Sequence, residues 1–253
     1  MRTQAIRIAT LTTTLLLSTL PAFARCDHRA ERSLSESLDG VERVEITAKA
    51  GDLDIRAGGS TLEARGDACA SSKNYLEEVQ LVASRSGSTL RVEVETPNTL
   101  GWNSGASLDL EIEVPNDVPL RITDGSGDTE IRGVTVEEIT DGSGEVRLTE
   151  TFGALDMTDG SGDVSVRGHE GTIEITDGSG DVSIRDIAGE VLVANDGSGD
   201  LDISQVSGSV EVRSDGSGDI FARAIGGDFE VGSGGSGDIK YREVEGRVSI
   251  PGD

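Results

Sequence analysis

Acidic residues recur at two fixed places beside a glycine-rich turn, and carboxylates in such a pattern could bind a cation. The tetrapeptide Asp-Gly-Ser-Gly occurs six times at intervals of 17 to 19 residues, and Gly234 begins a seventh, degenerate copy. The first residues of the six copies are Asp124, Asp141, Asp159, Asp177, Asp196 and Asp215, and a second acid follows each copy directly. Because Ca²⁺ takes oxygen ligands, four acids of this second set form a candidate metal site: Asp163, Asp181, Asp200 and Asp219.

Two other interpretations of these acids stay open. Asp side chains accept hydrogen bonds from backbone N–H groups two residues on, glycine supplies a positive φ, and serine caps the turn. Loosely held counterions would also offset the repulsion between stacked carboxylates, about 0.9 kcal/mol per pair in water. The calcium-binding nonapeptide roll reads Gly-Gly-x-Gly-x-Asp, and the order Gly-Ser-Gly-Asp differs from it in register. The sequence therefore favours turn chemistry and predicts no cofactor, with Ca²⁺ as the alternative.

The serines of the repeat are not arranged for nucleophilic catalysis. Asp-Gly-Ser-Gly is not the Gly-x-Ser-x-Gly elbow, and the serines of all the copies cannot all be nucleophiles. The chain has two histidines, His28 and His169, and we expect both at the surface. Trp102 lies in a polar loop, where its ring could stack on a sugar or fold back on the protein. These residues predict a protein that is not an enzyme.

Arginines recur at one place in most repeats, where a short alternating run ends: Arg56, Arg132, Arg167, Arg185, Arg223 and Arg242. Next to acidic residues they predict charge compensation on a solvent-facing surface, where each Arg–Asp pair adds little stability. A stripe that binds a polysaccharide or an acidic surface is the alternative.

The spacing of the repeat predicts the fold. Two runs of alternating apolar and polar residues separate successive Gly-Ser-Gly turns, as in 173–175 and 182–184, and a second glycine turn lies between them. Period two indicates half-buried strands. Self-similarity at a short period indicates stacked units, none of which buries its apolar face alone. The sequence predicts an all-β protein, a β-solenoid with two short strands per coil of 17 to 19 residues.

We divide the chain into three parts. Residues 1–24 read as a secretory signal peptide, with two arginines, an apolar stretch and a small-residue cleavage site after Ala24. Residues 25–120 read as a less regular N-terminal part of the solenoid, with a loop at 96–107 and a short helical turn at 72–79. Residues 121–253 form the regular repeat. After removal of the signal peptide we expect no membrane span.

The two cysteines, Cys26 and Cys69, predict a disulfide formed in an oxidising compartment, with two free thiols as the alternative. Arg25 stands directly before Cys26, where a lipoprotein signal has a small residue. The sequence therefore argues against a lipid anchor and favours an exported protein of the periplasm or cell surface.

The charge balance excludes one large class of partners. The chain has 22 Lys and Arg against 47 Asp and Glu, a formal charge of −25, and loss of the two arginines of the signal peptide makes it −27. Phosphates are bound by clustered Lys and Arg, so this is not a nucleic-acid-binding protein. The same charge disfavours docking on anionic lipid.

A family resemblance rests on the segment before the regular repeat. The run Leu108-Asp-Leu-Glu-Ile-Glu-Val-Pro115, then Val118-Pro-Leu-Arg-Ile-Thr123 and the recurring Gly-Ser-Gly-Asp coils, resembles the bacterial "putative adhesin" family of the cell envelope. The likeness covers residues 41 to 250. It implies a solenoid and a binding role, and it brings no catalytic residues with it.

Three functions follow from these observations. The first is an exported, non-enzymatic, adhesin-like scaffold that binds a partner protein or a glycan at the cell envelope. The second is a calcium-stabilised β-roll of the cell surface. The third is a polysaccharide-processing β-helix enzyme, which we disfavour because such enzymes have longer coils and a cleft formed by inserted loops.

Overall fold

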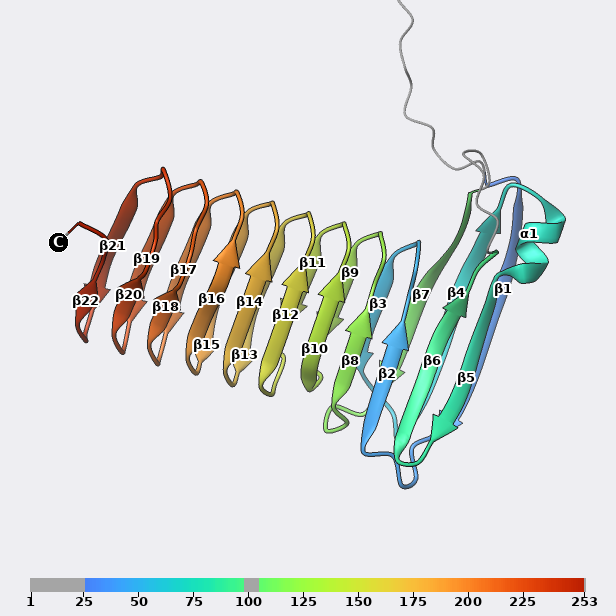
Figure 1. Ribbon diagram of the computed structural model, residues 1–253. Coiled ribbons are helices and arrows are strands. Elements are labelled where there is room, and N and C mark those ends of the chain that lie inside the picture. The colour runs from blue at the N-terminus through green and yellow to red at the C-terminus, as the bar shows by residue number, and fades with distance from the viewer. Residues whose placement is uncertain (1–25, 98–104, 253) are drawn as a thin grey trace, which may run out of the picture.

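The computed structural model describes residues 26–97 and 105–252. These residues form two eleven-stranded sheets, A and B, which face each other along a rod of stacked coils (Figure 1). The predicted all-β solenoid is therefore confirmed. The predicted signal peptide and Trp102 lie outside the described residues.

The order of the strands within each sheet differs from their order in the chain. In spatial order, sheet A consists of β1 (His28–Ser37), β4 (Thr61–Ala70), β7 (Ala106–Val114), β3 (Leu53–Ala57), β9 (Thr129–Arg132), β11 (Val146–Thr149), β13 (Val164–Glu170), β15 (Val182–Ala188), β17 (Leu201–Val206), β19 (Ile220–Ile225) and β21 (Ile239–Val244). Sheet B consists of β5 (Gln80–Ser86), β6 (Thr89–Glu95), β2 (Arg43–Thr47), β8 (Leu120–Thr123), β10 (Val136–Asp141), β12 (Leu155–Asp159), β14 (Ile173–Asp177), β16 (Val191–Asp196), β18 (Val210–Val212), β20 (Phe229–Val231) and β22 (Val248–Ser249).

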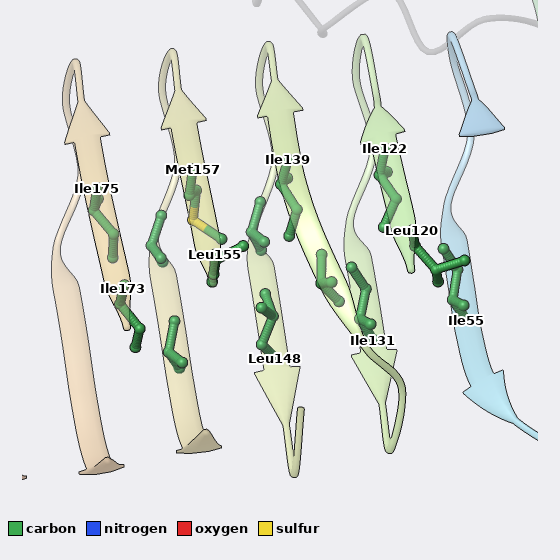
Figure 2. Packing of buried hydrophobic residues seen from close by; sticks show 14 of the residues in the cluster. Ile55, Leu120, Ile122, Ile131, Ile139, Leu148, Leu155, Met157, Ile173 and Ile175 are labelled. Carbon is green, nitrogen blue, oxygen red and sulfur yellow. The ribbon is translucent and has the colours of Figure 1, made fainter. Parts of the chain in front are cut away.

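Each regular coil gives one strand to each sheet, and equivalent residues of successive coils pair in parallel. The alternating sequence turns every second side chain inward. In sheet B the inward side chains Ile122, Ile139, Met157 and Ile175 follow one another along the rod, each no more than 1% exposed (Figure 2). Full burial of such a side chain contributes about 1.5–3 kcal/mol. Because each coil is covered by its neighbours, this stabilisation exists only in the stack.

The N-terminal part continues both sheets, but its coils are not stacked in sequence order. The coil of β2 and β3 lies between the coil of β6 and β7 on one side and that of β8 and β9 on the other. Antiparallel pairing joins β1 to β4, β4 to β7 and β5 to β6. These antiparallel strands end the stack of parallel coils, with β1 and β5 as the outermost strands.

The predicted turn at 72–79 contains α1 (Lys73–Glu78), the helix that the structure describes. Ser72 Oγ accepts a hydrogen bond from the Tyr75 N–H at 3.2 Å and caps its first turn. Arg32 of β1 donates from Nη2 to the Leu76 carbonyl at 2.7 Å and from Nε to the Val79 carbonyl at 2.8 Å. The arginine thus ties the helix to the end of sheet A.

The opposite end of the rod is formed by β21 and β22, the last strands of the two sheets. Tyr241 occupies an inward register position here but is 44% exposed, with its ring centroid 6.0 Å from that of Phe229. Pro251 follows the last strand and cannot donate to a further ladder. Across the described ranges, no helix has the length and hydropathy needed to cross a membrane.

Candidate functional site

The Gly-Ser-Gly turns line up along one edge of the rod because the strands on both sides of them pair in register. Gly180, at the fourth position of its turn, has a φ of +141°, and a Cβ there would lie 1.7 Å from the carbonyl oxygen of Gly162. Only glycine allows the backbones of successive turns to approach so closely. The two acids that flank each turn therefore form two columns.

The column after the turn forms what we call the outer ladder. In it a carboxylate Oδ1 accepts a hydrogen bond from the backbone N–H of the equivalent residue in the next coil, at 2.9 to 3.2 Å. The accepting residues are Asp109, Asp52, Asp128, Asp163, Asp181, Asp200 and Asp219. The sequence predicted that these carboxylates accept a hydrogen bond within their own turn. For this column the prediction is wrong, because each carboxylate accepts its hydrogen bond from the next coil.

A lysine neutralises the C-terminal end of the outer ladder. Lys240 Nζ lies 3.0 Å from Asp219 Oδ2 and 3.3 Å from Asp238 Oδ2. The Asp238 N–H and the Lys240 ammonium together lower the pKa of Asp219. Among the described residues, no group of three or more His, Cys, Asp or Glu is arranged to hold a metal ion.

We expect EDTA to leave the melting temperature of the chain without its signal peptide unchanged. Each outer-ladder carboxylate already accepts a backbone N–H, a charge-assisted bond that offsets part of the repulsion without a cation. The melting temperature is measured by circular dichroism in the presence of EDTA and in the presence of added Ca²⁺. A fall of several degrees on chelation that Ca²⁺ reverses would instead support the calcium-stabilised roll.

The column before the turn, which we call the inner aspartate column, is buried. It consists of Asp124, Asp141, Asp159, Asp177, Asp196 and Asp215, each 0 to 3% exposed. No carboxyl oxygen of this column forms a hydrogen bond of normal geometry with a described residue. The expected turn hydrogen bonds are reduced to weak contacts here, such as that of the Ser217 N–H with Asp215 two residues earlier. The sequence did contain a signal for the burial of these aspartates. Ile173, Ile175 and Asp177 follow one another at every second position, so Asp177 continues the inward alternation of its strand.

His169 is also buried, not at the surface as expected from the sequence. It lies near the end of β13 in sheet A, where its register partner in the next coil is the apolar Ile187. Its Nε2 donates to the Gly153 carbonyl at 3.0 Å, and its Nδ1 accepts from Thr151 Oγ1 at 2.9 Å. Burial lowers the pKa of His169, so the imidazole is a neutral structural group. The sequence contained a signal for this burial, because His169 occupies the position in its repeat at which the next repeat has the apolar Ile187.

The arginines of the repeat lie in one row across sheet A, interrupted by Thr149 and Ser204. Three of them pair with acids, as in Arg56 with Glu113 at 2.6 Å, Arg132 with Glu130, and Arg167 with Asp186 at 3.5 Å. Within the described ranges, Arg185, Arg223 and Arg242 have no carboxylate within 4.0 Å. Charge compensation therefore accounts for the N-terminal half of the row.

An open groove of about 550 Å³ lies on sheet A where the antiparallel strands meet the parallel coils. We call it the sheet A groove. Its lining contains two arginines, Arg65 and Arg147, and eight acids: Glu31, Asp52, Asp54, Asp67, Asp109, Glu111, Asp128 and Glu130. The outer ladder runs into it through Asp128, Asp52 and Asp109.

The two acids at the centre of the sheet A groove form no ion pair with a described residue, although Arg65 is the register partner of Glu111 on the neighbouring strand. Asp54 and Glu111 are register partners on adjacent strands, so their side chains lie side by side on the same face. In the part of the chain that the structure describes, neither carboxylate has a Lys or Arg nitrogen within 4.0 Å. The groove therefore presents a concentrated negative potential on a rigid sheet, a feature that the sequence pattern did not predict.

Cys26 and Cys69 are joined in a disulfide with their Cα atoms 5.3 Å apart. The bond closes a separation of 43 residues and ties the start of β1 to β4. It lies at the same end of the rod as the sheet A groove, which β1 and β4 also line.

These features define a class of protein, the β-solenoid of stacked two-stranded coils, here with two acidic columns along one edge. The chain belongs to the Toastrack DUF4097 family, whose sequence pattern matches residues 41–250. Comparison with curated proteins finds no match.

Comparison with solved structures finds proteins of similar architecture. A protein from Bacteroides fragilis named a "putative adhesin" is 13% identical, with a TM-score of 0.53 over 88% of this chain and 96% of that chain. A protein from Parabacteroides distasonis named a "putative lipid binding protein" is 16% identical, with a TM-score of 0.44 over 88% of this chain and 97% of that chain. At such identities the first likeness shows the fold alone.

Proposed function

We propose that this protein is an exported, non-catalytic scaffold of the cell envelope, adhesin-like in that it binds a partner protein, and that the partner docks in the sheet A groove. One observation carries the proposal: the groove holds eight carboxylates and two arginines on a surface of paired strands. Such a surface attracts a partner of opposite charge and raises its association rate.

The chemistry of the groove favours a basic protein segment over a neutral glycan. Carboxylates without internal partners form charge-assisted hydrogen bonds with Lys and Arg side chains. A neutral sugar offers no charge to match them. The name of the Bacteroides fragilis protein, a "putative adhesin", is compatible with a binding role.

Two features support export. The first 24 residues have the composition of a secretory signal peptide. The Cys26–Cys69 disulfide is a bond that persists in oxidising compartments and is rare in the cytosol. Both support a location in which the sheet A groove would meet other envelope components.

The test compares two double variants in a binding assay with purified bacterial envelope proteins. Asp54→Asn with Glu111→Gln removes two charges from the groove, and Asp156→Asn with Glu174→Gln removes two from the outer face of sheet B. Both pairs are register partners on adjacent strands, so the variants are matched in charge and location within a strand. We expect the groove variant to bind the partner at least about tenfold more weakly, a change of about 1.4 kcal/mol.

The control variant should bind as the unmodified protein does, and added salt should weaken binding to the unmodified protein most. Equal binding by all three proteins would contradict docking in the groove. Binding of an amino-sugar glycan instead would assign the groove to a glycan, and turnover of any polysaccharide would favour the enzyme.

A further inference from the structure

The inner aspartate column is an unusual set of buried acids. Its residues are consecutive register partners along the rod, so neighbouring carboxyls are one coil apart, about 4.8 Å. The column ends at residues without a titratable side chain. Ala48 occupies the equivalent position before Asp124, and Gly234 occupies the position after Asp215, and both are buried.

Six adjacent carboxylates cannot all be ionised in such a place. Each is at least 97% buried, and none of the twelve oxygens forms a hydrogen bond of normal geometry with a described residue. Weaker contacts from the backbone N–H groups of Gly125, Gly197 and Ser217 lower the pKa of Asp124, Asp196 and Asp215 only in part. Burial of a charge without a partner is so unfavourable that a group takes up a proton instead. A protonated carboxyl is a donor, and the neighbouring carboxylate in the column is an acceptor of matching geometry.

We propose that the inner aspartate column is a chain of carboxyl groups that share protons, in which alternate residues are protonated and donate hydrogen bonds to their ionised neighbours. Alternation divides the column into two sets, and we test Asp141, Asp177 and Asp215 as the donor set, each of which lies next to a possible acceptor in the same column. The protons come from the solvent when the chain folds. The column thereby becomes a device that makes the solenoid more stable in mildly acidic than in alkaline solution.

The charged groups around the column act in the same direction. Burial, and then the neighbouring carboxyls, raise the pKa of Asp141 and of Asp177 to about 8 and that of Asp215 to about 6. Burial also raises the pKa of Asp124 and of Asp196, to which the carboxylates of Asp52 and Asp181 in the outer ladder add repulsion. No Lys or Arg is among the main causes of these shifts. The residues that begin the facing strands of sheet A are not titratable: Thr129, Val146, Val164, Val182, Leu201 and Ile220.

The direction of the pH effect follows from these pKa values. A group whose pKa is raised on folding binds its proton more tightly in the folded protein than in the unfolded chain. Its contribution to stability is complete below the ordinary pKa of Asp, near 4, and is lost as the pH rises toward 8. Acids with lowered pKa, such as Glu113 beside Arg56, lose their contribution only below about pH 4.5. Between pH 5 and 8 the buried His169 acts in the opposite direction, because its lowered pKa removes stability as the pH falls below about 6.5. The proposal therefore requires the carboxyls of the column together to outweigh this single imidazole.

The decisive variant replaces the three donors by asparagine: Asp141→Asn, Asp177→Asn and Asp215→Asn. An amide has the shape of a protonated carboxyl and donates hydrogen bonds at every pH. We expect this variant to melt several degrees higher than the unmodified protein at pH 8 and to lose the rise in melting temperature from pH 8 to pH 5, because only the opposing effect of His169 remains in that range. The unmodified protein should melt higher at pH 5 than at pH 8.

The matched control replaces three carboxyls of the outer ladder: Asp128→Asn, Asp163→Asn and Asp200→Asn. It removes the same number of titratable groups and lowers the net charge at least as much, so it separates the column from the general effect of net charge. We expect it to keep the pH dependence of the unmodified protein. If the control flattens the pH profile as much as the donor variant does, net charge alone explains the profile and the proposal is wrong.

Infrared spectroscopy of the unmodified protein gives a readout that does not depend on the folding of any variant. We expect a C=O stretching band of protonated carboxyl groups at pH 7, which disappears as the pH is raised through 8. Absence of that band at pH 7, or a stoichiometric metal ion found by elemental analysis together with a lower melting temperature of the donor variant, would overturn proton sharing.

Discussion

Gly180→Ala is expected to prevent the central coils from folding. The new Cβ would lie 1.7 Å from the carbonyl oxygen of Gly162 in the preceding coil, and 2.5 Å from its carbonyl carbon. Neither atom belongs to a side chain that could move away, so the two coils must separate and break the backbone hydrogen bonds between them. We expect a loss of more than about 4 kcal/mol, the range of exceptional single substitutions. Chemical denaturation followed by circular dichroism, with limited proteolysis to locate the opened coils, measures it.

Gly87→Ala is the control for this substitution. Gly87 also has a positive φ, of 62°, but a Cβ there meets no atom within 4 Å. The backbone strain alone costs about 1–2 kcal/mol, and the protein should remain folded. If the two variants unfold at the same denaturant concentration, the close stacking of the turns does not restrict this position to glycine.

Loss of the disulfide is expected to have the second-largest effect. Cys26→Ser opens a loop of about 43 residues, and the chain-entropy relation gives about 4 kcal/mol for a loop of this length. The remaining pairing of β1 with β4 extends over ten residues, from His28 to Ser37, and should hold part of the strand in place. Equilibrium denaturation of the oxidised protein and of Cys26→Ser measures the difference in unfolding free energy.

Reduction provides the matched comparison. Dithiothreitol should lower the stability of the unmodified protein to that of Cys26→Ser and should leave the variant unaffected. If dithiothreitol does not change the stability of the unmodified protein, the bond contributes nothing to folding in solution. The support that it gives to an oxidising location would then be lost as well.

The stack of coils could be predicted from local features of the sequence. Alternation such as Ile173–Ile175 and Val182–Ile184 indicates which face of a strand is inward, and it needs no knowledge of distant residues. The interval between turns fixes the length of a coil, and a repeated unit that cannot bury its own core must stack. The arginine row followed from the same register.

The environment of the acids could not be predicted as reliably. Asp177 and Asp181 flank the same Gly-Ser-Gly turn and have the same chemistry, yet one is fully buried and the other accepts a hydrogen bond at the surface. The path of the backbone through the turn decides between them, and that path is set by the contact of Gly180 with the preceding coil. Continuing the inward alternation into the turn would have identified Asp177.

The sequence alone determined the class of fold, the inward aliphatic residues and the places where glycine is required, because periodicity and turn chemistry are local. The tertiary structure decided three things: which aspartates lose contact with water, that His169 is buried, and that β4 and β7 pair antiparallel and border an acidic groove. The reason is that burial and electrostatic potential depend on neighbours that are distant in the chain. Asp54 and Glu111 are 57 residues apart in sequence but lie side by side in the sheet A groove.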